Sequence, residues 1–120
     1  MKKVLVVDDE AISLLTLSMS LSDEGYEVHS AKNGSEALKT GQSAPPDVLV
    51  SDWKLGDEID GLELAGRLSH NNPNLKSIIL SGLSLEDLPQ ENLPKHLIFR
   101  FLSKPCSIDD VLGAVRDALA

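Results

Sequence analysis

Five short apolar runs alternate with segments of helical periodicity along this chain, and that alternation constrains the fold more than any other feature. The runs occupy residues 3–7, 27–31, 48–51, 77–80 and 97–102. Three are almost continuous in Val, Ile and Leu, as is typical of strands covered on both faces, whereas residues 27–31 alternate and indicate an edge strand. Strand and helix alternation over a whole chain predicts a parallel sheet with helices on both faces. We therefore expect one α/β domain spanning residues 1–120.

The segments between the runs carry the start and stop signals of helices. Gly25 suits the residue after the end of the first helix, and the second helix is expected to begin after Asn33. A third helix ends near residues 71–73. Ser107 and Asp110 have capping-box spacing at the start of the last helix. The apolar stripe predicted for the first helix comprises Ile12, Leu14, Leu15, Leu17, Met19 and Leu21.

The segment between Gly82 and Leu97 fits a regular helix poorly. Pro89 and Pro94 lie within it, and each proline removes a backbone donor and clashes with the preceding turn. We expect a short or distorted helix there.

Composition excludes several classes of protein. Nineteen acidic and eleven basic side chains give a net charge of −8, and the basic residues are scattered, which disfavours direct nucleic-acid binding. The single cysteine, Cys106, excludes an internal disulfide framework. No apolar run approaches the roughly 20 residues of a membrane span, and residues 4–7 are too short for a signal peptide. We expect a cytoplasmic protein with no membrane contact.

Polar side chains follow four of the five predicted strands. Ligands bind beyond the carboxyl ends of the strands in an open parallel sheet, so these side chains are expected to converge at one edge. They are Asp8, Asp9 and Glu10 after the first run, Asp52 after the third, Ser81 after the fourth and Lys104 after the fifth.

Three crowded carboxylates repel one another, and a hard cation such as Mg²⁺ offsets that repulsion. Lys104 would add a second positive charge. Such a site suits a phosphoryl group whose oxygens are neutralised while a carboxylate attacks phosphorus, which gives an aspartyl phosphate.

Five motifs stand in a fixed order: KVLVVDDE at 3–10, NGSEAL at 33–38, VLVSD at 48–52, DGLEL at 60–64 and FLSKP at 101–105. Together they resemble the receiver domains of two-component response regulators. The resemblance covers nearly the whole chain and is weakest between Leu83 and Leu97. It implies a doubly wound, flavodoxin-like α/β fold with five parallel strands in the order 2-1-3-4-5.

The resemblance also implies a metal site and an acceptor. Asp52 matches the phosphoacceptor. Asp9 would bind Mg²⁺ directly and Asp8 mainly through water, with the backbone carbonyl of Lys54 as a further ligand.

Three further residues match the family's response to phosphorylation. Ser81 corresponds to the hydroxyl residue that turns towards the phosphoryl group, and Lys104 to the lysine that contacts a phosphoryl oxygen. Phe101 corresponds to the switch aromatic that rotates inward, and the Lys104–Pro105 bond is expected to be cis.

The implied function is phosphorylation-dependent signalling. A histidine kinase or histidine phosphotransfer protein would be the donor, and an unknown downstream protein would be the target. The chain would assist its own phosphorylation and dephosphorylation without being a turnover enzyme.

The chain departs from the family pattern at two places. Gly56 stands where a proline is usual, and Asp60-Gly61 comes one residue late, which predicts an altered loop after Asp52. Lys95-His96 stands near the usual Gly-Ala, so we expect an unusual partner surface. Trp53 is placed to lie exposed near the site, where it would report metal or phosphate binding.

Two other classes of function compete with this interpretation. The altered loop is compatible with an interaction module that does not use phosphorylation, although the retained acids and lysine argue against it. An aspartyl phosphatase needs Asp-x-Asp after its first strand, and a flavin carrier needs a loop rich in Ser, Thr and Gly there. The sequence Asp8-Asp9-Glu10 fits neither enzyme.

Overall fold

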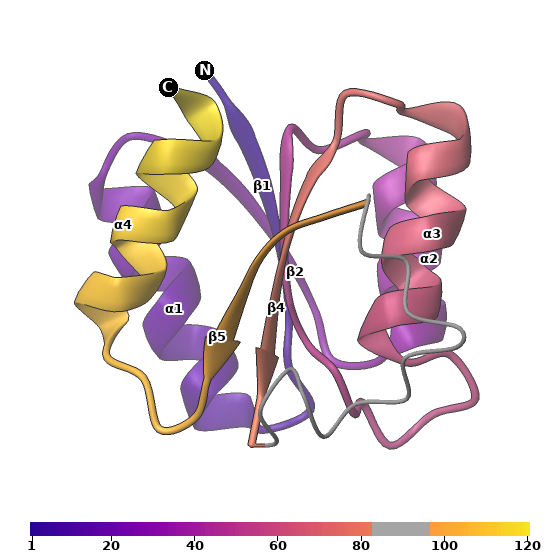
Figure 1. Cartoon of the computed structure of the whole chain (residues 1–120), viewed down its shortest axis with the longest axis horizontal. Coiled ribbons are helices and arrows are strands. Elements are labelled where there is room, and N and C mark those ends of the chain that lie inside the picture. Colours follow the sequence, from indigo (N-terminus) through magenta and orange to yellow (C-terminus); the bar gives the residue numbers. More distant parts are fainter. Residues whose placement is uncertain (83–96) are drawn as a thin grey trace.

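A parallel β-sheet lies between two layers of helices in the computed structural model, which describes residues 1–82 and 97–120 (Figure 1). The strands are β1 (Lys3–Val7), β2 (Glu27–Ala31), β3 (Val48–Asp52), β4 (Lys76–Ser81) and β5 (Ile98–Ser103). The helices are α1 (Ala11–Asp23), α2 (Gly34–Ser43), α3 (Gly61–Asn71) and α4 (Ile108–Leu119). All pairings are parallel and the order is β2-β1-β3-β4-β5, which confirms the predicted flavodoxin-like sheet and places β2 at an edge.

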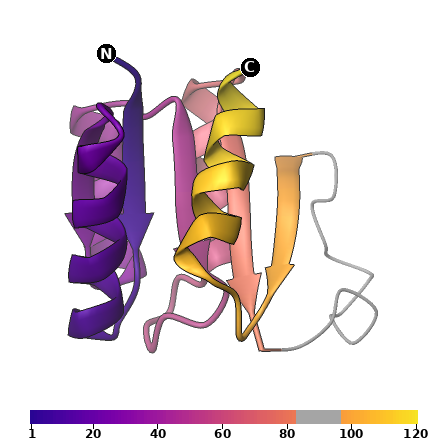
Figure 2. The same cartoon turned by 90° about the vertical axis from the view of Figure 1, so that its left-hand side faces the viewer.

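The twofold alternation of side chains along β1 builds both hydrophobic layers. Val4 and Val6 are fully buried in the layer that contains residues of α1 and α4. Leu5 and Val7 point to the opposite layer, which contains residues of α2 and α3. Helices therefore cover both faces, as predicted, and Figures 1 and 2 show α4 beside α1 on one side of the sheet. Burial of each such side chain contributes about 1.5–3 kcal/mol.

The predicted helix signals occur where the sequence indicates them. Asn33 Oδ1 accepts the backbone N–H of Glu36 at 2.8 Å at the start of α2. Ser107 and Asp110 form the complete capping box of α4. Gly25 follows the end of α1 with φ of 97°.

The single apolar stripe predicted for α1 is wrong. Leu17 and Leu21 are buried and Leu14 packs against them. The other half of the stripe faces solvent, because a helix turns about 100° per residue and places positions 12, 15 and 19 roughly opposite positions 14, 17 and 21. The exposed fractions are 76% for Ile12, 61% for Leu15 and 58% for Met19.

The expectations for Pro89, Pro94 and Lys95-His96 lie outside the described residues and stay predictions. Within residues 1–82 and 97–120, no helix has the length and apolar character needed to cross a bilayer.

Candidate functional site

Three carboxylates meet at the carboxyl ends of β1 and β3. These strands are adjacent, with Val7 opposite Ser51, so the next residue of each, Asp8 and Asp52, emerges at the same edge. One oxygen each from Asp8, Asp9 and Asp52 lies within 4.8 Å of the others. Asp8 is only 3% exposed and Asp52 only 5% exposed, whereas Asp9 is open to solvent. The predicted convergence of these acids is confirmed.

Lys104 reaches the same cluster from the end of β5. Its Nζ lies 2.7 Å from Oδ1 of Asp52. Its backbone N–H donates to the carbonyl of Ser81 at 2.7 Å, which ties the ends of β4 and β5 together. Ser81 is buried there, and the Lys104–Pro105 bond is cis, as predicted.

Burial and charge change the proton affinity of the central acid. Burial, aided by the negative charge of Asp8, raises the pKa of Asp52 to about 6, although contact with Lys104 acts in the opposite direction. Partial burial lowers the pKa of Lys104, but the contact with Asp52 and the charges of Asp52 and Asp8 outweigh it, and the net shift is upward. A second cation beside Asp52 would therefore relieve an existing electrostatic cost.

Asp8 is held in place by the start of α1. Its Oδ1 accepts the backbone N–H of Glu10 at 2.9 Å, while the Glu10 side chain makes no cap at this helix end. Two buried carboxylates and one exposed carboxylate form a set of hard oxygen donors, which fits Mg²⁺ and leaves coordination positions for water.

The loop between β3 and α3 differs from what the sequence suggests. Trp53 is only 7% exposed, so the expectation of an exposed tryptophan is wrong. Its ring packs with Ile79 and Phe101, because the side chain after Asp52 turns into the sheet–helix interface. The ammonium of Lys54 lies 4.2 Å from the centre of the Trp53 ring and covers it.

Gly61 allows α3 to start directly against the end of β3. Its backbone N–H donates to the carbonyl of Trp53 at 2.7 Å. A Cβ at this position would lie 2.3 Å from the carbonyl oxygen of Asp52, closer than real Cβ atoms approach. The late Asp60-Gly61 pair therefore still begins the helix, and Asp60 caps it through the N–H of Glu63 at 2.9 Å.

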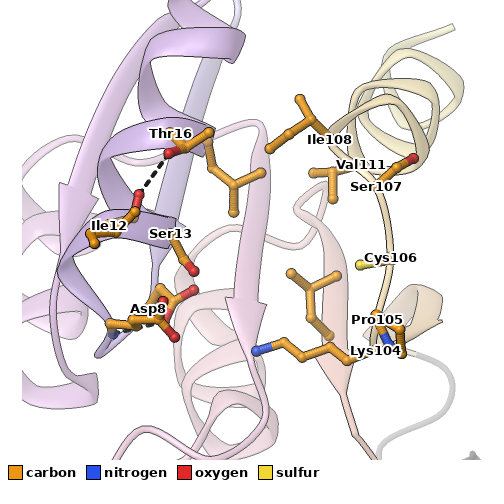
Figure 3. A pocket seen from close by; sticks show the side chains of 13 residues that line it. Asp8, Ile12, Ser13, Thr16, Lys104, Pro105, Cys106, Ser107, Ile108 and Val111 are labelled. Carbon is orange, nitrogen blue, oxygen red and sulfur yellow. Dashed lines mark hydrogen bonds between the residues drawn. The ribbon is translucent and has the colours of Figure 1, made fainter.

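A pocket of about 550 Å³ adjoins the acidic cluster between α1 and the start of α4 (Figure 3). Asp8 and Lys104 line its polar end, and the Lys104 ammonium extends towards Asp8. Ile12, Ile108 and Val111 line its apolar part. The pocket thus reaches the acidic cluster at Asp8, on the side of α1.

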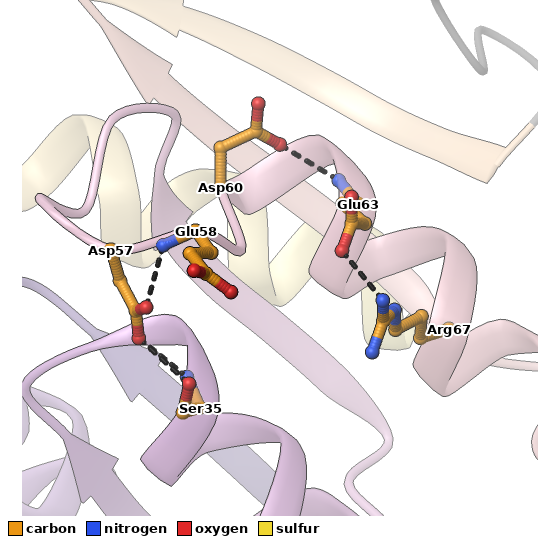
Figure 4. Close-up of polar contacts among 6 residues, drawn as sticks. All are labelled: Ser35, Asp57, Glu58, Asp60, Glu63 and Arg67. Atoms are coloured by element: carbon orange, nitrogen blue, oxygen red, sulfur yellow. Dashed lines mark hydrogen bonds and ion pairs between the residues drawn. The ribbon is translucent and has the colours of Figure 1, made fainter.

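Sequence reasoning missed one polar contact at the site. Asp57 in the loop after β3 accepts hydrogen bonds from Ser35 at the start of α2 (Figure 4). The two residues are 22 positions apart, and neither residue type at its position indicates the other. Only the folded loop brings them together.

The fold and site together define a doubly wound α/β domain with an acidic cluster and a lysine at the carboxyl ends of its strands. Residues 4–116 match the family model described as the response regulator receiver domain, and the chain belongs to that family. Receiver domains are signalling phosphoacceptors of two-component systems and bind Mg²⁺ at an acidic site.

Relatives include proteins of very different length. The chain is 33% identical over 97% of its residues to the transcriptional regulatory protein GlrR of Escherichia coli, but spans only 26% of that protein. It is 30% identical to sporulation initiation phosphotransferase F of Bacillus subtilis, covering 98% of this chain and 94% of the relative. The response regulator TrrA of Thermotoga maritima, solved in complex with Mg²⁺ and BeF, superposes with a TM-score of 0.83 at 32% identity, covering 98% of this chain and 99% of TrrA.

Proposed function

We propose that this chain is a phosphorylation-dependent signalling receiver in which Asp52 accepts a phosphoryl group from a histidine kinase or histidine phosphotransfer protein. One observation carries the proposal. The Asp52 carboxylate is buried, its Oδ1 lies 2.7 Å from Lys104 Nζ, and it lies within 4.8 Å of oxygens of Asp8 and Asp9. This combination supports Asp52 as the nucleophile, because Lys104 and a cation held by the three acids would neutralise an incoming phosphoryl group.

Asp8, Asp9 and Asp52 would hold Mg²⁺, together with the backbone carbonyl of Lys54. The buried Asp8 and the exposed Asp9 suit different tasks, with Asp9 as a direct ligand and Asp8 acting mainly through water. When bound, Mg²⁺ neutralises phosphoryl oxygens during transfer.

Lys104 is the protein's own positive charge beside Asp52, in addition to any bound cation. Its ammonium already contacts Asp52, so phosphorylation would exchange a carboxylate contact for a contact with a phosphoryl oxygen. Asp52 reacts as the carboxylate, since only the deprotonated oxygen is a nucleophile. Burial raises the pKa of Asp52 in the metal-free protein, and a cation beside Asp52 would favour the carboxylate form that reacts.

Ser81 and Phe101 would convert the new charge into a surface change. Phosphorylation adds about −1.5 to −2 charges, and the buried Ser81 at the end of β4 would turn its hydroxyl to those oxygens. Phe101 is half-buried and packs with Trp53 and Ile79. Inward rotation of Phe101 would then alter the face that a downstream protein contacts.

Family membership supports the assignment of partners. Relatives include a sensor kinase of Brucella abortus and a phosphotransferase of Bacillus subtilis, so a kinase or phosphotransfer protein is the proposed donor. The net charge of −8 supports a protein target and no direct contact with nucleic acid. We propose that residues 1–120 act as one receiver domain in the cytoplasm.

Labelling by acetyl phosphate tests this function. Incubation with acetyl phosphate and Mg²⁺ should add one acid- and base-labile phosphoryl group, and Asp52→Asn should abolish the addition. Asp23→Asn, which removes an exposed acid at the end of α1, should label like wild type. Equal labelling of Asp52→Asn and wild type would refute Asp52 as acceptor. If wild type shows neither labelling nor any response to Mg²⁺, the interaction module that does not use phosphorylation would be favoured instead.

A further inference from the structure

The loop at residues 53–60 is tied to α2 by one acidic side chain. Oδ2 of Asp57 accepts the backbone N–H of Ser35 at 3.1 Å and the Ser35 hydroxyl at 2.8 Å (Figure 4). The other oxygen, Oδ1, accepts the N–H of Glu58. These hydrogen bonds lower the pKa of Asp57, so the anchor is an ionised carboxylate at neutral pH.

Two glycines show how closely the loop approaches its neighbours on either side of this anchor. Gly34, at the start of α2, lies so close to the loop that a Cβ there would be 2.3 Å from the carbonyl oxygen of Ile59. Gly56 has φ of 65°, and a Cβ on it would lie 3.5 Å from Oδ2 of Asp9. Gly56 therefore lies beside the acidic cluster, and the next residue, Asp57, already contacts the N-terminus of α2.

We propose that Asp57 is a positioning residue for the cation site, acting through Ser35. By fixing the loop to the first turn of α2, Asp57 holds Gly56 beside Asp9 and holds the preceding Lys54, whose backbone carbonyl is the proposed ligand. This inference rests on the proposed function of the acidic cluster.

The anchor matters because the loop is long and contains a glycine. Residues 53–60 separate β3 from α3, and Gly56 among them has φ of 65°. A longer loop with a glycine has more conformations available. The contact of Asp57 with Ser35 holds the loop in one position, because Ser35 belongs to the first turn of α2, which Asn33 caps.

A purely structural role makes a different prediction. Ser35 is exposed and Asp57 is half-buried, so their contact is expected to add little to global stability. A positioning role instead changes Mg²⁺ affinity, because removal of an outer contact of a metal site typically weakens metal binding by about 10- to 100-fold.

The test is an Mg²⁺ titration of the ¹⁵N-labelled protein followed by amide chemical shifts. Asp57→Ala should weaken Mg²⁺ binding by roughly tenfold. Ser35→Ala should weaken it by about threefold, since the backbone donor remains. The double variant should be no weaker than Asp57→Ala alone, because both changes remove one contact.

Glu58→Ala is the matched control. Glu58 is the neighbouring exposed acid, and the structure shows no hydrogen bond or ion pair of its side chain to the described residues (Figure 4). This variant removes the same charge from the same loop, so its affinity should stay within about twofold of wild type. Asp57→Asn keeps an oxygen acceptor for Ser35 and should recover affinity to about that of the control.

The Ser35 amide supplies a readout that a structural role would not affect. Mg²⁺ should shift this amide in wild type through the loop, but not in Asp57→Ala, while urea unfolding midpoints in EDTA stay similar. Unchanged Mg²⁺ affinity in both Asp57→Ala and Ser35→Ala, with normal binding by wild type, would overturn this inference alone. Failure of wild type to bind Mg²⁺ would overturn both this inference and the proposed function.

Discussion

Two connections border the same acidic cluster, and they are held there in different ways. The connection after β1 is only residues 8–10, and Asp8 and Asp9 take their places directly from the strand end and the start of α1. The connection after β3 is residues 53–60 and needs anchors of its own. Leu55 and Ile59 are buried among residues of α2 and α3, and Asp57 binds Ser35.

This difference separates two kinds of sensitivity. In the short connection, a side chain can be removed without moving the backbone, because β1 holds one end and α1 holds the other. In the long connection, substitutions change where the backbone lies. Substitutions in residues 8–10 should therefore remove metal ligands directly, whereas substitutions in residues 53–61 should act through the position of the backbone.

The largest expected effect is on metal binding by the short connection. Asp9→Asn should weaken Mg²⁺ binding by about 100-fold or more, because loss of a ligand costs more than the 10- to 100-fold loss from an outer contact. Its urea unfolding midpoint in EDTA should stay the same or rise, since one of three crowded acids is neutralised. Normal Mg²⁺ affinity, measured by amide shifts with Asp23→Asn as control, would contradict the role of Asp9.

Gly61→Ala, at the end of the long connection, should mainly lower the free energy of unfolding. The new Cβ would meet the Asp52 carbonyl oxygen at 2.3 Å, so the backbone must shift, at a cost of about 1–3 kcal/mol in the free energy of unfolding. Gly113→Ala in α4 is the control, because nothing lies within 4 Å of its Cβ position. That control should be neutral or stabilising by up to about 1 kcal/mol. Equal urea unfolding curves for Gly61→Ala and wild type would show that the two backbones do not meet this closely.

The pH dependence of stability tests the buried acid. Burial raises the pKa of Asp52 from 3.8 to about 6, so between these values the folded protein keeps a proton that the unfolded chain has lost. The free energy of unfolding without metal should therefore fall as pH rises from about 4 to 6, by on the order of 2 kcal/mol. Urea unfolding in EDTA at several pH values measures this slope. The difference in the free energy of unfolding between wild type and Asp52→Asn isolates the contribution of Asp52. A difference that stays constant with pH would contradict a raised pKa.

The smallest expected effect concerns the N-terminal caps of α1 and α3, the helices that follow the two connections. Asp60 caps α3 through the N–H of Glu63, whereas the Glu10 side chain makes no cap on α1. Asp60→Ala should destabilise the protein by about 1 kcal/mol, and Glu10→Ala by less than about 0.5 kcal/mol. Similar losses in urea unfolding would mean that the two helix starts do not differ.

The residues that sequence reasoning placed correctly are those next to strand ends. Asp8, Asp9, Asp52 and Lys104 converge because each lies at or within two residues of the carboxyl end of a strand whose apolar pattern indicates its place in a parallel sheet. Their individual roles in phosphoryl transfer stay predictions.

Other features depend on contacts that a local pattern does not encode. The apolar residues of α1 occupy two opposite faces, and their pattern does not indicate which face packs against the sheet. Ile12 is exposed, while Leu17 is buried. Trp53 turns inward because Ile79 and Phe101 offer an apolar surface beside it. The contact of Asp57 with Ser35 depends on how far the loop extends, and turn-forming residues alone do not specify that distance.

Chemical mapping of the phosphorylated residue tests the central claim most directly. The protein is treated with acetyl phosphate and Mg²⁺, reduced with borohydride, which converts an aspartyl phosphate to homoserine, and sequenced by mass spectrometry. The account predicts homoserine at position 52 alone, and none when Mg²⁺ is chelated with EDTA. Homoserine at another aspartate, or equal conversion with and without Mg²⁺, would contradict it.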